Sequence, residues 1–140
     1  MARVAGHRRA TAVSQPTTPA PGIRSINAVT LRTGDMAASV AFYRALGMTV
    51  TFGGADARFT SLGAGDCHVN LTLALVVPAT PFPGRIVFYV DDVDTFHERI
   101  CAAGYVPESE PADAPWGERF FHIHDPSGHE LSFARPLSKP

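Results

Sequence analysis

The sequence lacks several features that would assign it to a broad class of proteins. No apolar run approaches the roughly 20 residues that span a bilayer, so no membrane-embedded segment is expected. The longest apolar stretch, residues 69–77, suits a buried strand. The formal net charge is only −1, and binding to nucleic acid needs a strong basic excess. Neither a membrane nor nucleic acid is therefore expected as a partner.

Cysteine is also scarce, because Cys67 and Cys101 are the only two in the chain. A disulfide framework in so short a sequence would use more of them. Both thiols are therefore expected to be free and buried, as in a cytoplasmic protein.

What the sequence does contain is enough for one packed domain. It has 140 residues, of which 45% are hydrophobic and 18% are charged. Residues 1–22 differ from the rest, since they are rich in Ala, Thr and Pro and contain no acid. This composition predicts a disordered basic tail, and the lack of a continuous apolar stretch argues against a secretory signal. A single domain is expected over residues 23–136.

Within this domain one pattern occurs twice. In the first copy a strand precedes Asp35, which is followed by an eleven-residue helical segment and Gly47; in the second a strand precedes Asp92, a similar segment and Gly104. Aspartate is a good helix N-cap, and glycine commonly follows a helix C-terminus. The predicted elements are strands at 26–33, 58–62, 68–77 and 85–90 and helices at 36–46 and 93–103. The copies superpose at an offset of 57, which places Arg85 on Ala28, so two units of strand, helix and further strands are expected.

The stretch from 116 to 133 closes the second copy with a hairpin. Asp125, Pro126 and Gly128 occupy positions that favour a type I turn. Side chains on a strand alternate between its two faces, so Phe120, His122 and His124 are expected on one face and Phe121 and Ile123 on the other.

Three motifs resemble the vicinal oxygen chelate superfamily, which includes glyoxalases, bleomycin-resistance proteins and extradiol dioxygenases. They are DMAASVAFYRALG (35–47), VDDVD (90–94) and DPSGHEL (125–131). The resemblance implies an α+β fold of two tandem βαβββ modules that form a cup-shaped mixed sheet. Module one would cover 24–77 and module two 85–135, joined by a Pro-rich linker at 78–84. It also implies a homodimer, since members of this superfamily often complete their cups across two chains.

Metal-dependent members of the superfamily bind one divalent ion with four His or Glu side chains, one from the first and one from the last strand of each module. The corresponding positions here are Ala28, Asn70, Arg85 and Ser132. Alanine offers no donor atom, and the arginine cation repels a divalent ion. Another metal site made of His122, His124 and Glu130 matches no strong zinc spacing. No metal cofactor is therefore expected.

The resemblance and the residues together leave three functions open. The favoured one is a metal-independent protein that binds a small anionic or planar molecule in the cup. The expected ligand-binding residues are Asn70, Arg85, Tyr89, Trp116, Phe120, His122 and Ser132, with Trp116 acting either as a core plug or as a lid over the ligand. The second is a metal-dependent lyase or dioxygenase with ligands displaced to His68, His122 or Glu130. The third is a metal-free enzyme that uses His122, His68 or Glu130 as a base and Arg85 to stabilise an oxyanion.

Overall fold

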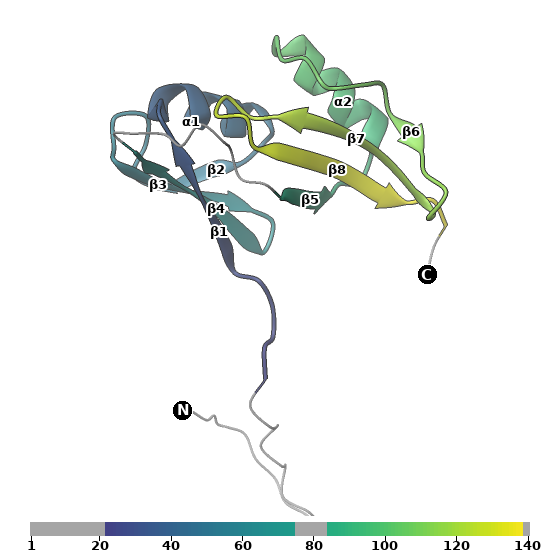
Figure 1. Ribbon diagram of the computed structural model, residues 1–140, viewed down its shortest axis with the longest axis horizontal. Helices are drawn as coiled ribbons and strands as arrows, with labels where there is room; N and C mark the ends of the chain where they lie inside the picture. The colour runs from purple at the N-terminus through teal and green to yellow at the C-terminus, as the bar shows by residue number, and fades with distance from the viewer. Residues whose placement is uncertain (1–21, 75–83, 139–140) are drawn as a thin grey trace, which may run out of the picture.

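The computed structural model describes residues 22–74 and 84–138. The expected tail at 1–22 and the expected linker at 78–84 lie almost entirely outside these residues. The first half contains β1 (Ala28–Thr33), α1 (Met36–Ala45), β2 (Thr49–Phe52), β3 (Phe59–Ala64) and β4 (Cys67–Leu73). The second half contains β5 (Arg85–Tyr89), α2 (Val93–Ala102), β6 (Ala112–Asp113), β7 (Glu118–His124) and β8 (Glu130–Pro136). The expected two-unit α+β arrangement is present (Figure 1).

The two halves share one topology. The first sheet has the strand order β1-β4-β3-β2 and the second has the order β5-β8-β7-β6. In each sheet the first strand of the module runs parallel to its last strand, with Ala28 opposite His68 in one half and Arg85 opposite Glu130 in the other. All other strand pairs are antiparallel. The internal repeat read from the sequence is therefore a structural repeat, and Arg85 occupies the place of Ala28.

Both helices begin where the sequence predicted and end one residue earlier, at Ala45 and Ala102, so that Leu46 and Ala103 are the C-caps. The carboxylate of Asp35 accepts a hydrogen bond from the backbone of Ala38, and that of Asp92 accepts one from Thr95. This bond lowers the pKa of Asp92. Gly47 follows α1 with φ near 99°, a conformation that favours glycine over residues with a side chain.

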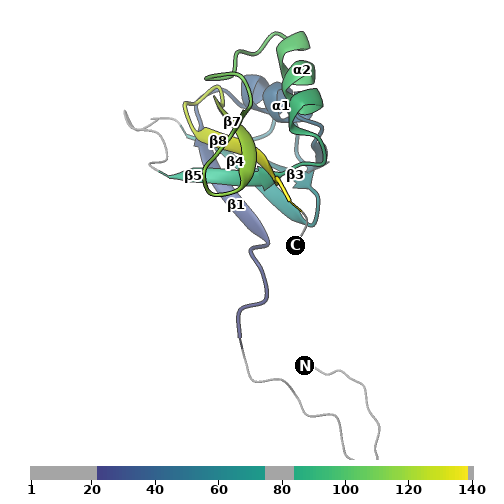
Figure 2. The same ribbon diagram turned by 90° about the vertical axis from the view of Figure 1, so that its right-hand side faces the viewer.

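The helices cover the same side of the two sheets (Figures 1 and 2). Alternate strand residues point toward them and build one continuous core, in which Phe133 of β8 contacts the rings of Phe88, Phe96 and Phe121. The opposite face of each sheet carries exposed side chains instead, including Val87. A functional site is therefore expected on these exposed faces, which are called here the open faces.

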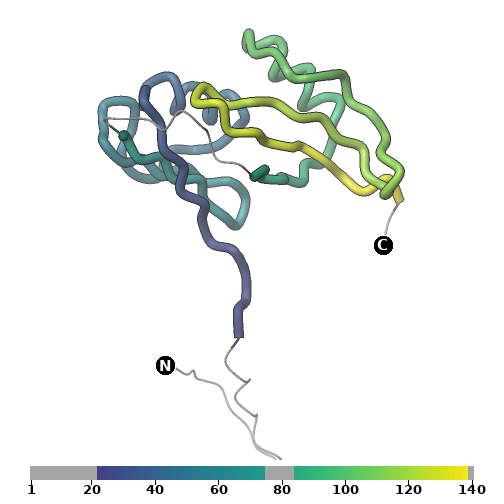
Figure 3. The backbone as a smooth tube through the Cα atoms, viewed as in Figure 1, coloured from purple at the N-terminus to yellow at the C-terminus, as the bar shows by residue number. Residues whose placement is uncertain are grey.

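A buried hydrogen bond ties the two halves together. The turn between β7 and β8 reaches back to the first half (Figure 3), where Asp125 accepts a hydrogen bond of 2.7 Å from the hydroxyl of Tyr43. Burial and the neighbouring Asp125 carboxylate raise the pKa of Tyr43, so its hydroxyl stays protonated. The Ser127 hydroxyl donates a 3.1 Å hydrogen bond to the Thr33 hydroxyl, and His129 Nε2 lies 2.9 Å from the carbonyl oxygen of Arg32.

Some expectations about single residues were wrong. Cys67 and Cys101 are free, but the first is only half-buried and the second is exposed. His97 of α2 is buried against the ring of Phe121, and its Nε2 lies 3.2 Å from the carbonyl oxygen of Ser109. In the part of the chain that the structure describes, no helix has the length and apolar character needed to cross a membrane.

Candidate functional site

Most of the expected ligand-binding residues lie on the open face of the second sheet. Arg85 and Tyr89 come from β5, and Phe120 and His122 from β7, while Trp116 lies just before β7. Ser132 of β8 is opposite His122 in the strand ladder and is buried. The period-2 pattern of β7 is as expected, because Phe121 and Ile123 point into the core.

Asn70 and His68 belong to the open face of the first sheet. Asn70 accepts a hydrogen bond of 2.7 Å from the Ser61 hydroxyl and donates one of 3.3 Å to Thr30. His68 is half-buried and lies opposite Ala28. No described contact joins either residue to the second sheet, so the structure does not bring the whole expected set together.

Three rings form a row on the second sheet. The ring centres of Trp116 and Phe120 are 5.7 Å apart, and those of Phe120 and His122 are 4.9 Å apart. Trp116 is 69% exposed, which excludes the core-plug interpretation. The two pairs are tilted, with 31° and 45° between their ring planes. This aromatic row, defined as Trp116, Phe120 and His122, offers π surfaces to a planar partner.

Glu118 connects the aromatic row to β5. Its carboxylate accepts a hydrogen bond of 3.1 Å from the Trp116 indole and a short one from the Tyr89 hydroxyl. The bond to Glu118 raises the pKa of Tyr89. Beside Tyr89 and Val87 the surface is hollowed, with a cavity of about 420 Å³ that Met48 and Phe96 also line. Glu118 lies in phase with Phe120 on β7, so strand periodicity could have identified it from the sequence.

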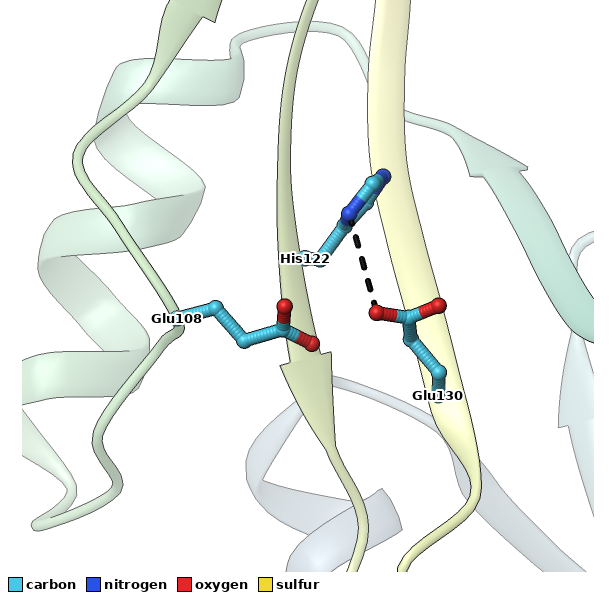
Figure 4. A group of neighbouring side chains, drawn as sticks. All are labelled: Glu108, His122 and Glu130. Carbon is cyan, nitrogen blue, oxygen red and sulfur yellow. Dashed lines mark ion pairs between the residues drawn. The ribbon is translucent and has the colours of Figure 1, made fainter.

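A charged cluster lies at the other end of the face. Glu108, His122 and Glu130 place one side-chain ligand atom each within 4.8 Å of one another, and the two carboxylates reach toward the same space (Figure 4). Arg85 Nε lies 2.8 Å from Glu130 Oε1, and His124 Nδ1 lies 3.2 Å from Glu108 Oε2. These three residues, Glu108, His122 and Glu130, are called here the carboxylate–histidine cluster.

The ionisation of the carboxylate–histidine cluster follows from this crowding. Partial burial and the hydrogen bond with Glu130 raise the pKa of Glu108. The same hydrogen bond, aided by Arg85, lowers the pKa of Glu130. Partial burial and the nearby Arg85 cation lower the pKa of His122. At neutral pH His122 is therefore neutral and Glu130 is ionised, and Glu108 is the first of the two carboxylates to take up a proton.

The four positions that hold a metal ion in metal-dependent members of the superfamily do not fit one here. Ala28 and Asn70 lie on the paired strands β1 and β4 of the first sheet. Arg85 and Ser132 lie at the equivalent places on the paired strands β5 and β8 of the second sheet. Alanine has no donor atom, and Arg85 brings a guanidinium whose side chain is half-exposed and paired with Glu130.

Comparison with known proteins shows the family. A family model for the glyoxalase/bleomycin resistance protein/dioxygenase superfamily matches residues 25–133. The chain belongs to this superfamily, as the sequence motifs predicted.

Individual relatives are distant. CFP32 of Mycobacterium bovis, named as a glyoxylase by inference, is 34% identical over 82 residues, which are 59% of this chain and 31% of that protein. The chain therefore spans about a third of the length of this relative. An uncharacterised protein of Mycolicibacterium smegmatis is 32% identical over 81% of this chain and 96% of its own length.

Solved structures share the fold. A glyoxalase/bleomycin resistance protein/dioxygenase from Nocardioides superposes with a TM-score of 0.68 at 26% identity, covering 86% of this chain and 88% of that one. A bleomycin-binding protein complexed with bleomycin superposes with a TM-score of 0.65 at 21% identity, covering 81% of this chain and 98% of the other. The second likeness shows the fold alone.

Proposed function

We propose that this protein binds a small planar molecule on the open face of its second sheet, without a metal ion at the four positions used by metal-dependent relatives. The observation that carries the proposal is the aromatic row, in which the largest ring, Trp116, is left exposed. An exposed tryptophan beside a second ring and a fixed carboxylate is a binding surface, because stacking supplies affinity and the carboxylate supplies direction.

The charges on this face favour a ligand that carries a hydrogen-bond donor or a positive charge. Glu108, Glu118 and Glu130 all reach it, and the guanidinium of Arg85 is already paired with Glu130. An anionic ligand would have to displace that carboxylate and would meet two more. We therefore retain the expectation of a planar ligand and drop the expectation of an anionic one.

We expect binding to depend on the aromatic row. Because Trp116 is the only tryptophan, its fluorescence should be quenched by proflavine, a planar cation, and hardly changed by anthracene-2-sulfonate, a planar anion. Trp116→Ala and Phe120→Ala should each weaken proflavine binding about 10-fold, roughly 1.4 kcal/mol, through lost stacking. Because the Trp116→Ala variant has no tryptophan fluorescence to quench, its affinity is measured from the fluorescence anisotropy of proflavine.

A matched control comes from the first sheet. Phe52 is another exposed ring, with its centre 6.4 Å from that of Phe59. Phe52→Ala should leave proflavine affinity within about twofold, since surface changes away from a site have small effects. Equal losses for Phe52→Ala and Trp116→Ala, or tighter binding of the anionic dye, would contradict the proposal.

The functional unit that we propose is a homodimer. Val87, Tyr89 and Trp116 of the second half are all more than half exposed on the single chain. One open sheet covers only one side of a small molecule, whereas binding sites usually bury 70–90% or more of their ligand. A second copy facing this surface would supply the missing side. Light scattering should give twice the chain mass of 15.0 kDa at micromolar concentration, and a monomer that still binds proflavine tightly would argue against the dimer.

A further inference from the structure

The carboxylate–histidine cluster is assembled from three neighbouring backbone segments. His122 lies on β7 and Glu130 on β8, where β7 and β8 form an antiparallel ladder. Glu108 precedes β6, and its backbone N–H donates a 2.9 Å hydrogen bond to the carbonyl oxygen of His122. This bond holds the backbone of Glu108 beside β7. The three ligand atoms converge without any rearrangement of the backbone.

Each carboxylate of the cluster is held by a partner outside it. Arg85 binds Oε1 of Glu130, while Oε2 of the same group lies 3.8 Å from Nδ1 of His122. His124 holds Oε2 of Glu108 at 3.2 Å. Outer partners of this kind orient the ligands of metal sites and fix which oxygen faces the ion.

We propose that Glu108, His122 and Glu130 bind one divalent transition-metal ion. Two carboxylate oxygens and one imidazole nitrogen are ligands that Zn²⁺ and Mn²⁺ accept, and the imidazole disfavours Mg²⁺ and Ca²⁺, which prefer oxygen alone. The ion would take the place of the hydrogen bond between the two carboxylates. None of the ligands occupies Ala28, Asn70, Arg85 or Ser132, so this site differs from the metal position of metal-dependent relatives.

This inference goes beyond the proposed function and does not depend on it. Metal binding rests on Glu108 and Glu130, whereas stacking of a planar molecule rests on Trp116 and Phe120. The two sites meet at His122, which leaves the remaining coordination positions of the ion facing the open face.

Titration of the full chain without an affinity tag, after dialysis against a chelator, tests the site. Mn²⁺ followed by electron paramagnetic resonance is the main probe, since it binds poorly to thiolates and so avoids Cys67 and Cys101. We expect one Mn²⁺ and one Zn²⁺ per chain at micromolar concentration, with Mg²⁺ at least 10-fold weaker. Glu108→Gln should weaken Mn²⁺ and Zn²⁺ binding at least 10-fold.

Glu110→Gln is the matched control, because it removes the same charge from an exposed glutamate of the same segment. It should leave the metal affinity within about twofold. His122→Asn gives a second variant of the cluster, and thermal melting confirms that each variant is folded. No Mn²⁺ or Zn²⁺ binding, or equal affinities for the Glu108 and Glu110 variants, would overturn the inference.

Trp116→Ala separates the failure of this inference from that of the proposed function. It should weaken proflavine binding and leave Mn²⁺ affinity unchanged. If wild type binds proflavine through Trp116 but binds no metal, only the metal site is wrong. If it binds metal through Glu108 but no planar dye, only the proposed function is wrong.

Discussion

Asp125→Ala is expected to lower the free energy of unfolding by about 3 kcal/mol. The carboxylate of Asp125 is buried and accepts three hydrogen bonds, from the Tyr43 hydroxyl and from the backbone N–H groups of Ser127 and His129. Alanine leaves the Tyr43 hydroxyl buried without its acceptor and frees the turn between β7 and β8. Chemical denaturation followed by circular dichroism measures the change.

Two further variants sharpen this prediction. Tyr43→Phe removes one of the three hydrogen bonds and should cost less, about 1–2 kcal/mol. Asp66→Ala changes an exposed aspartate in the corresponding turn between β3 and β4, and it should cost no more than about 0.5 kcal/mol. If Asp125→Ala and Asp66→Ala lowered the free energy of unfolding by the same small amount, the contact of Asp125 with Tyr43 would not stabilise the pairing of the two halves. Because the turn leads into Glu130, Asp125→Ala should also loosen the carboxylate–histidine cluster.

Phe133→Ala is expected to cost about 3–5 kcal/mol, because it leaves a cavity in the core. The ring of Phe133 is 1% exposed and stacks on Phe88 at 5.4 Å between ring centres. It also lies 4.7 Å from the ring of Phe96 on α2 and 5.5 Å from that of Phe121 on β7. Its removal therefore weakens the packing of a helix and two strands at once, and the midpoint of thermal unfolding should fall by many degrees.

Phe59→Ala provides the comparison for Phe133. Phe59 is an aromatic residue on a strand of the first sheet, but its side chain is on the open face. Its truncation should cost less than about 1 kcal/mol. Similar losses for Phe59→Ala and Phe133→Ala would mean that the second-sheet core tolerates collapse around the deleted ring, contrary to the close packing seen in the structure.

The regular elements with strong local signals could be predicted from the sequence. Both helices carry an aspartate cap and a following glycine, and the long strands alternate apolar and polar residues. β2 was missed because it is mostly exposed and its pairing with β3 is irregular between Val50 and Phe52. β6 was missed because it is only two residues long and lies in a proline-rich stretch. Neither strand has a periodicity that a sequence pattern could reveal.

The candidate site was predictable only in part. The alternation in β7 placed Phe120 and His122 on one face, and the internal repeat placed Arg85 on Ala28. Glu108 was missed, since a glutamate in a segment without periodicity gives no sign of its neighbours. The pairing of Arg85 with Glu130 was missed as well, because the two residues are 45 positions apart and meet only through the parallel pairing of β5 with β8.

The sequence by itself determined the family, the two repeated units, the starts of both helices and the residue types at the four positions compared with the metal ligands of relatives. These properties depend on residue identity and on neighbours within a few positions along the chain. The tertiary structure alone decided that Glu108, His122 and Glu130 converge, that Glu130 pairs with Arg85 and that Trp116 stays exposed. Each of these depends on strand register and on packing between distant segments, and local periodicity carries no information about which distant segments become neighbours.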